Sequence, residues 1–162
     1  EKPPEGGVSV LSRSVAVNEE LRQAAERLLS AVGWHGVAMV EFRVSDTGQP
    51  YLMELNTRFW GSLQLAIDAG VDFPLMLANC HLNRPNPPIT TYREDQRLRW
   101  LLGDLDSLYI YLKRKHTFSD KLKRILEFIV IRPRHQKHEI NRLYDLKPAW
   151  VELKQYLTSL RR

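Results

Sequence analysis

Cysteine is nearly absent from this 162-residue chain, because Cys80 is its only one. A single cysteine excludes an internal disulfide and is compatible with a reducing compartment. The sequence also lacks a run of 18 apolar residues and the pattern of a signal peptide, so nothing in it suggests a membrane span or export. We therefore expect a cytoplasmic protein.

Repeats and low-complexity tracts are also lacking, and 43% hydrophobic with 27% charged residues is typical of a chain that builds one core, or one domain with a small appendage. No second His or Cys stands at ligand spacing from His35, which favours a loop residue over a zinc ligand. The opening residues 1–4 contain no initiator Met, so we expect a processed, truncated or excised segment.

Two apolar runs separated by turn residues predict a β-hairpin. The runs at 37–40 and 51–53 flank the turn sequence at 46–50, so they should pair antiparallel. Glu41 follows the first run and Glu54 follows the second. The two carboxylates should then lie nearly opposite each other.

Opposed carboxylates repel unless a cation lies between them. Glu54 and Asn56 are two residues apart and share a strand face, which Arg58 continues if the extended path persists. Hard oxygen ligands favour Mg²⁺, with Mn²⁺ as an alternative, and an arginine beside the ion suits phosphate. The residues predict a magnesium–nucleotide site, and a surface hairpin with one exposed acid on each strand is the alternative.

Glu41, followed after the hairpin by Glu54-Leu55-Asn56-Thr57-Arg58, resembles the C-terminal lobe of the ATP-grasp superfamily. The segment Arg58-Phe59-Trp60-Gly61-Ser62-Leu63 is similar to its carbamoyl-phosphate-synthase-like and carboxylate–amine ligase branches. The resemblance covers roughly residues 5–85. It implies an α+β fold in which helices flank an antiparallel sheet.

The resemblance also implies roles for five residues. Glu41, Glu54 and Asn56 match the family's ligands for the Mg²⁺ ions on ATP. Arg58 matches the catalytic arginine that stabilises the ATP phosphates and an acyl-phosphate. Met53 matches an apolar residue that commonly lies against adenine, so Met53, Glu54 and Arg58 are the expected ATP contacts.

The implied reaction is that of an ATP-dependent ligase. ATP would phosphorylate a small-molecule carboxylate, and an amine or ammonia would displace the phosphate. Ser62 stands where biotin-carboxylase-like members carry Glu, which argues against bicarbonate-activating carboxylase chemistry. The family's N-terminal lobe, with its ATP-binding lysines and glycine-rich lid, has no counterpart here, so we expect half an active site that is inactive alone. A non-catalytic ATP-grasp remnant is a further alternative.

Charge is divided unevenly along the chain. Residues 1–83 contain 6 Lys/Arg and 10 Asp/Glu, a net charge of −4, whereas residues 84–162 contain 18 and 9, a net charge of +9. The basic half permits a rival hypothesis, a module that binds nucleic acid or an anionic membrane surface. Its candidate residues are Lys113–His116, Lys121, Lys123, Arg124 and 132–137. They lack an interleaved stacking motif, so nucleic acid is the less favoured partner.

The breaker cluster at 83–88 predicts a boundary between an ATP-grasp lobe at 1–85 and a mainly helical basic appendage at 86–162. Within the lobe, residues 8–15 predict a strand that pairs with the hairpin. Helices are expected from Asn18 to Gly33, over 63–69, from Asp72, from about Asp104, from Ser119-Asp120 and from Pro148.

Overall fold

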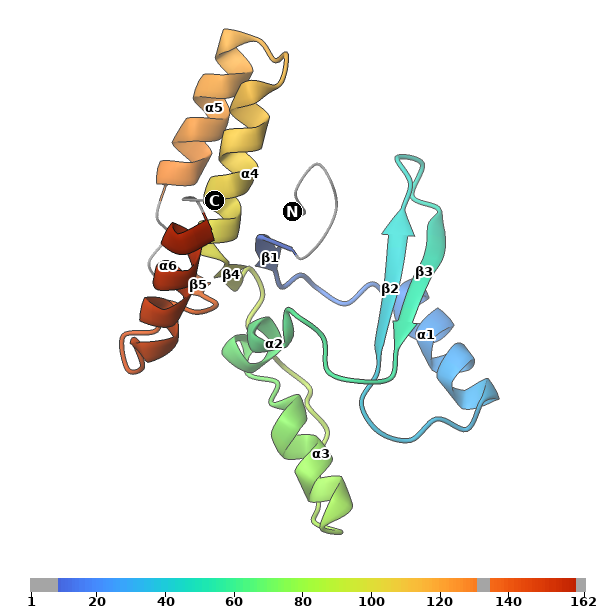
Figure 1. The fold of residues 1–162 in the computed structure, drawn as a ribbon. Coiled ribbons are helices and arrows are strands. Elements are labelled where there is room, and N and C mark those ends of the chain that lie inside the picture. Colours follow the sequence, from blue (N-terminus) through green and yellow to red (C-terminus); the bar gives the residue numbers. More distant parts are fainter. Residues whose placement is uncertain (1–8, 131–134, 160–162) are drawn as a thin grey trace. The chain divides into compact units, whose positions relative to one another are not determined.

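The computed structural model describes residues 9–130 and 135–159 (Figure 1). Helices and short strands both occur within them, and the α+β class predicted from the sequence is confirmed. The strands are β1 (Leu11–Arg13), β2 (Met39–Val44), β3 (Pro50–Asn56), β4 (Arg97–Arg99) and β5 (Gln136–His138). The helices are α1 (Glu19–Ala31), α2 (Leu63–Ala69), α3 (Phe73–His81), α4 (Leu101–Lys113), α5 (Phe118–Ile129) and α6 (Lys147–Ser159). No described helix has both the length and the apolar character needed to cross a membrane.

The chain packs as two compact units, which we describe separately. The hairpin unit is Ser14–Glu94, and the terminal unit combines Glu1–Arg13 with Asp95–Arg162. Packing thus divides the chain after Arg13 and after Glu94, whereas the sequence predicts that the family lobe ends at residue 85. That limit stays a prediction.

The predicted hairpin is present in the hairpin unit. β2 and β3 pair antiparallel as a two-stranded sheet. Ser45 and Gln49 close the turn, since the Ser45 amide donates to the Gln49 carbonyl at 2.9 Å and the Ser45 hydroxyl accepts from the Gln49 amide at 3.0 Å. Gly48 lies within the turn at φ +86°, a conformation that glycine adopts at low cost.

Helix α1 begins and ends as the sequence predicts. The Asn18 side chain accepts a hydrogen bond from the Leu21 amide at 3.1 Å. At the other end, Gly33 has φ +59° and Trp34 N–H donates to the Leu29 carbonyl at 2.9 Å, which is a Schellman ending. No residue of this described helix is buried.

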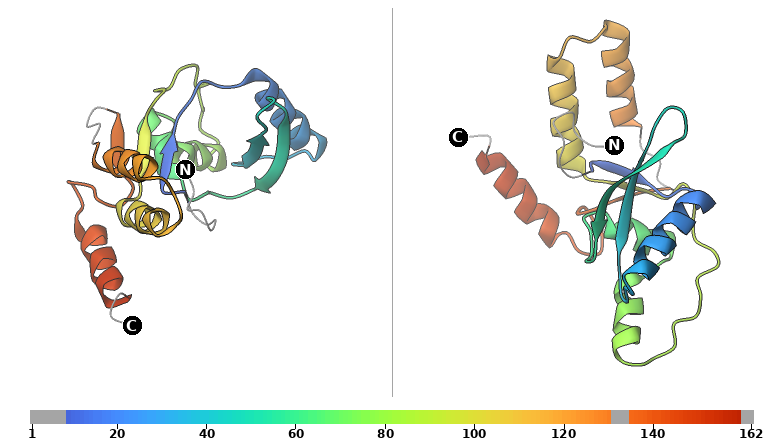
Figure 2. Two further views of the ribbon diagram at one scale, coloured as in Figure 1. Left: turned by 90° about the horizontal axis from the view of Figure 1, so that it is seen from above. Right: turned by 90° about the vertical axis from the view of Figure 1, so that its right-hand side faces the viewer.

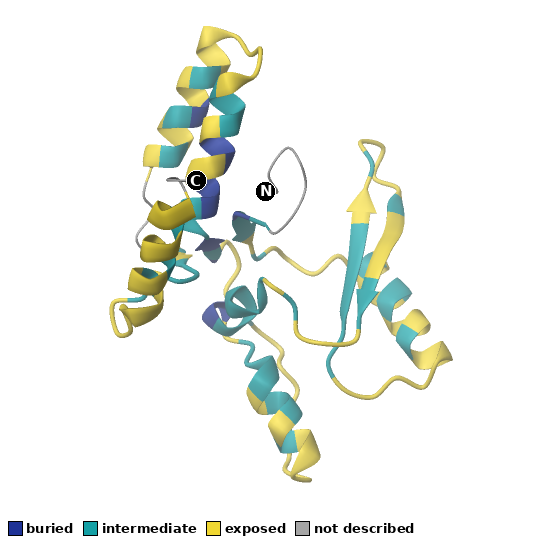
Figure 3. Ribbon diagram, viewed as in Figure 1, coloured by how far each residue is buried: buried dark blue, intermediate teal, exposed yellow. Residues whose placement is uncertain are grey.

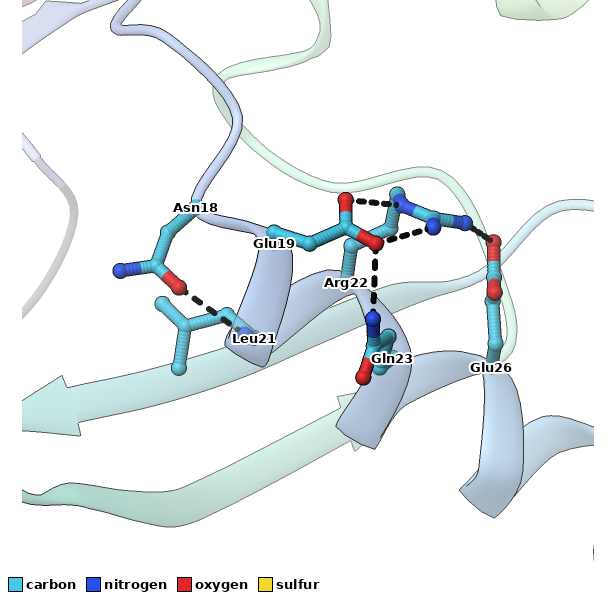
Figure 4. A network of polar contacts seen from close by, with 6 residues as sticks. All are labelled: Asn18, Glu19, Leu21, Arg22, Gln23 and Glu26. Carbon is cyan, nitrogen blue, oxygen red and sulfur yellow. Dashed lines mark hydrogen bonds and ion pairs between the residues drawn. The ribbon is translucent and has the colours of Figure 1, made fainter.

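The first turns of α1 carry a network of side-chain contacts (Figure 4). Arg22 donates to Glu19 at 2.8 Å and also pairs with Glu26 one turn later. The hydrogen bonds that Glu19 accepts, first from Arg22 and then from Gln23, lower the pKa of Glu19 to about 2. The network is exposed, so it contributes only modestly to stability.

Helices α2 and α3 follow the hairpin within the same unit. Gly70, at φ +108°, ends α2, and Asp72 caps α3 by accepting from the Leu75 amide at 2.9 Å. The Trp60 and Phe73 rings meet edge to face, with centroids 5.2 Å apart. Trp60 therefore packs against the start of α3.

The terminal unit has a three-stranded sheet in the order β1-β4-β5, where β1 and β4 are antiparallel and β4 and β5 are parallel. The prediction that the first strand pairs with the hairpin is wrong. It pairs with β4 instead, and the Trp100 amide donates to the Val10 carbonyl at 2.9 Å. Val10 and Leu98 are buried in this unit, so the pairing places its apolar residues in a core.

Helices α4 and α5 lie side by side in the terminal unit (Figure 2). α5 begins after Thr117 rather than at the predicted Ser119, because the Thr117 hydroxyl accepts from the Asp120 amide at 3.2 Å. α4 begins at Leu101, three residues before the predicted Asp104. Trp100 approaches α4 so closely that a Cβ on Gly103 would meet its ring at 2.3 Å.

Buried positions are few among the described residues and lie mostly in the terminal unit (Figure 3). Three of them form a charged cluster, Arg99, Asp104 and Arg124. Arg99 Nε donates to Asp104 at 2.7 Å, and Arg124 Nη2 donates to the other carboxylate oxygen at 2.5 Å. Arg99 also lies over the Phe128 ring, 4.3 Å from its centroid.

Candidate functional site

The register of β2 and β3 sets Glu41 directly opposite Glu54. Two positions along, Met39 lies opposite Asn56. Because directly opposed residues of an antiparallel pair point to one face, and side chains alternate along a strand, Glu41, Glu54 and Asn56 share a face of the hairpin. The structure therefore brings the three predicted metal ligands together, while their role as ligands stays a prediction.

A β-bulge interrupts the ladder beside these carboxylates. Glu41 pairs with Glu54, but the next residue, Phe42, pairs with Leu52, so Met53 is the extra residue. A bulge bends its strand and re-aims side chains, and bulges are frequent next to active sites. Met53 therefore does not follow the alternation of a regular strand, and its side chain is 57% exposed.

Arg58 lies beyond the strand. β3 ends at Asn56, and Thr57 and Arg58 form a bend. The extended path that would have carried Arg58 on the face of Glu54 does not persist. Its Nη1 donates to the Phe59 carbonyl at 3.0 Å.

Ser62, which replaces the Glu of biotin-carboxylase-like members, immediately precedes α2. Within the described residues its side chain makes no capping hydrogen bond to that helix. The hydroxyl is thus not committed to capping the helix. The bearing of Ser62 on carboxylase chemistry stays a prediction.

The chemistry of this donor set suits Mg²⁺. Two carboxylates and one amide oxygen are hard donors, and Mg²⁺ is usually bound by one or two carboxylates, with water and substrate phosphates at the remaining positions. The described residues contain no group of three or more His, Cys, Asp and Glu residues that could hold a metal, and the predicted set includes only two such residues, both Glu. A set of this size would leave the remaining Mg²⁺ positions to water or phosphate oxygens.

Sequence reasoning missed the Met53 bulge and the buried Arg99–Asp104–Arg124 cluster. Asp104 was interpreted only as part of a helix start, although two arginines bond to it. Nothing in the spacing indicates that Arg124, 20 residues further on, reaches the same carboxylate. The cluster also commits Arg124, one of the candidates for a basic binding surface, to a buried ion pair.

Comparisons with known proteins agree with the resemblance to the ATP-grasp superfamily but do not identify the branch expected from the sequence. A 55-residue segment is 49% identical to Acetyl-CoA carboxylase 2 of Oryza sativa subsp. japonica; this match covers 33% of the chain and 2% of the relative. The chain thus spans a small part of that relative's length. No solved structure matches the chain.

The family model described as "ATP-grasp in the biosynthetic pathway with Ter operon" matches residues 2–103, well over half of the chain. The match includes the whole hairpin unit and continues through β4 into the start of α4. Both comparisons support an ATP-binding module of the ATP-grasp type. The chain belongs to this ATP-grasp family.

Proposed function

We propose that this chain is the ATP- and Mg²⁺-binding half of an ATP-dependent carboxylate–amine ligase. The observation that carries the proposal is the register that sets Glu41 against Glu54, with Asn56 on the same face. Like charges directly opposite each other on an antiparallel pair repel, and a cation bound between them would relieve that repulsion. Membership of an ATP-grasp family supports ATP as the nucleotide of the metal complex.

Each residue has a distinct task in this proposal. Glu41, Glu54 and Asn56 would hold Mg²⁺, which supplies neutralisation of the phosphate charge when bound. Arg58 offers guanidinium N–H groups to phosphate oxygens from the bend after β3. Met53, bulged out of the ladder beside Glu54, offers an apolar, polarisable side chain to the adenine ring.

The proposed reaction has two steps. An oxygen of the substrate carboxylate attacks the γ-phosphorus of ATP, the bond from phosphorus to the β–γ bridging oxygen breaks, and ADP leaves with that electron pair. The amine nitrogen then attacks the acyl carbon, the bond from that carbon to the phosphate oxygen breaks, and inorganic phosphate leaves with the electron pair while the nitrogen loses a proton to solvent. Arg58 stabilises the negative charge on the phosphoryl group and needs no covalent bond to it.

Exposure of the site argues that this chain alone does not complete the reaction. Met53 and Glu54 are both exposed. Water competes with the phosphates for charged side chains at such a surface, and it hydrolyses acyl-phosphates. A second lobe that covers the nucleotide would exclude this water and strengthen each electrostatic contact.

The test is ADP formation by the longest native protein that contains this chain, supplied with panels of carboxylates and amines. Glu54→Gln keeps the side chain's volume but removes the charge that holds the metal. We expect this variant to lower turnover at least about a hundredfold. The reason is that a bound metal ion typically stabilises the charge of the transition state by several kcal/mol, and Glu54→Gln would weaken its binding. Glu94→Gln makes the same change at an exposed turn position of the same unit and should leave turnover unchanged.

Wild-type turnover in Glu54→Gln would overturn the metal assignment. A wild-type protein that binds Mg-ATP but releases no ADP with any carboxylate would instead support a non-catalytic ATP-grasp remnant.

A further inference from the structure

The terminal unit contains a pocket that the proposed ligase chemistry does not use. Its volume is 530 Å³, within the range of small-molecule sites, and β1, β4, α4, α5 and β5 contribute to its wall. None of its lining residues belongs to the predicted Mg-nucleotide set. Its charged lining comprises four cationic and two acidic side chains, a net charge of +2: Arg97, Arg99, Lys123, Arg124, Asp104 and Glu127.

The buried charged cluster forms part of this wall. Arg99, Asp104 and Arg124 are 4%, 3% and 8% exposed, and together they carry one more positive than negative charge. A buried net charge is costly in a medium of low dielectric constant unless an opposite charge lies near it. An anion in the pocket would supply that charge.

Two donors in the wall are unused. Arg97 Nε and the Gln136 side-chain amide nitrogen are both buried and have no hydrogen-bond partner among the described residues. Arg97 pairs with Asp95 only through Nη2, at 3.4 Å. β4 and β5 place these two residues directly opposite each other in the ladder, so their donors can serve one acceptor group.

A neighbouring histidine lies close to two of the positive charges in this region. His138 is the ladder partner of Arg99. Burial, and then the charges of Arg99 and Arg142, lower the pKa of His138. Burial is the larger cause and disfavours charge of either sign, so only the smaller contribution, from Arg99 and Arg142, reflects nearby positive charge.

We propose that this pocket binds a phosphorylated small molecule through its phosphoryl group. The phosphoryl oxygens would accept from Arg97 and Gln136, and the Lys123 ammonium would add charge at the exposed rim on α5. A phosphate monoester carries a charge of about −1.5 to −2 near pH 7, which matches the net +2 of the wall.

The size and lining of the pocket indicate more than inorganic phosphate. A volume of 530 Å³ leaves room for an attached organic group. Leu11, Leu126 and Val130 line the pocket and provide apolar surface for that group. The ligand class is thus a phosphate monoester or diphosphate with a partly apolar body, rather than a bare anion.

Calorimetry of the full chain with inorganic pyrophosphate, without divalent metal, tests the site. We expect saturable binding at one site. Arg97→Gln should weaken it at least about tenfold, since a hydrogen bond between charged groups is typically worth that much. Lys123→Gln removes a charge at the exposed rim and should weaken binding measurably but by less. Lys121→Gln removes the same charge from the same helix but does not line the pocket, so it should leave affinity unchanged.

Further measurements separate this proposal from its rivals. Pyrophosphate binding should persist in Glu54→Gln, so the pocket proposal would survive failure of the ligase proposal. Thermal unfolding should show that Lys123→Gln remains folded. Citrate binding as tight as pyrophosphate would assign the pocket to carboxylates and overturn the phosphoryl class. An equal loss in Lys121→Gln and Lys123→Gln, or no saturable binding, would overturn the site itself.

Discussion

Glu41, which is half-buried, and Glu54, which is exposed, face each other across the hairpin, and this arrangement leads to a prediction about stability as well as catalysis. Like charges directly opposite on a ladder are destabilising by about 0.2–1 kcal/mol. In the absence of divalent metal, Glu54→Gln should therefore raise the free energy of unfolding by about that amount. Chemical denaturation measures it, and the matched Glu94→Gln change should have an effect near zero.

On the proposed function, a metal site that costs stability when empty would account for two carboxylates that repel each other. A fall in stability on Glu54→Gln would contradict this explanation, because it would mean that the carboxylate makes a favourable structural contact. The result is independent of any knowledge of the substrates.

Asp104 is the single acid of the buried charged cluster, and its removal should be severe. Asp104→Asn leaves Arg99 and Arg124 buried without their carboxylate, and breaking a buried pair in this way typically costs about 3–5 kcal/mol. Thermal and denaturant unfolding measure the loss. Asp95→Asn is the control, because Asp95 is exposed and pairs with Arg13 and Arg97 only at 3.6 and 3.4 Å. Similar losses in the two variants would contradict the buried ion-pair account.

Two side-chain bonds tie α6 to the rest of the terminal unit. Tyr156 donates to Asp106 on α4 at 2.5 Å, and the Trp100 indole donates to Glu152 at 2.5 Å. The Asp106 bond, and then burial, raise the pKa of Tyr156 from its ordinary value of 10.0 to about 12. The titration of the Tyr156 phenol can therefore be used to monitor the docking of α6.

The folded state holds the Tyr156 proton more tightly than the unfolded state, so its contribution to stability is complete below pH 10 and is lost as the pH rises from 10 to 12. The difference in tyrosinate absorbance between wild type and Tyr156→Phe should titrate near pH 12. In Asp106→Ala, the same difference titration should move toward pH 10. A midpoint near 10 in the wild-type background would show that α6 does not dock through this bond.

Local sequence signals predicted some elements well and others poorly. The β2–β3 hairpin and the start of α1 followed from turn and capping residues, because these interactions lie within a few residues of the chain. The partner of β1 did not, since Leu11 pairs with Arg99 across 88 positions and each strand is only three residues long. The Met53 bulge depends on how two strands align, and no residue type in the hairpin indicates it.

The site itself was predictable as a set of residues but not as a geometry. Glu41, Glu54 and Asn56 were predicted together because a two-residue period and an opposed pair follow directly from strand pairing. Arg58 was placed on the same face only on the condition of a continuing strand, and the bend after Asn56 removes that condition. The Arg99–Asp104–Arg124 cluster depends on tertiary packing, which a single sequence does not encode in its local pattern.

Over the whole chain, the two compact units carry different chemistry. The hairpin unit holds the predicted Mg-nucleotide residues and has few buried side chains, whereas the terminal unit buries three charged residues and has the basic pocket. The family match spans the first unit and enters the second. We infer that nucleotide chemistry belongs to the hairpin unit and that the helical part of the terminal unit adds a separate binding function.

The proposed function depends most on the paired carboxylates of the hairpin, which are proposed to hold the metal of a metal–ATP complex. Nuclear magnetic resonance of the labelled chain, with substoichiometric Mn²⁺ and a nonhydrolysable ATP analogue, tests it even when binding is weak, because line broadening reports low occupancy. We predict that amide signals of residues 39–41 and 54–56 broaden first, that broadening falls off toward the turn at 46–48, and that Glu54→Gln abolishes it while Glu94→Gln does not. Strongest broadening at any other part of the chain, or a pattern unchanged in Glu54→Gln, would contradict the account.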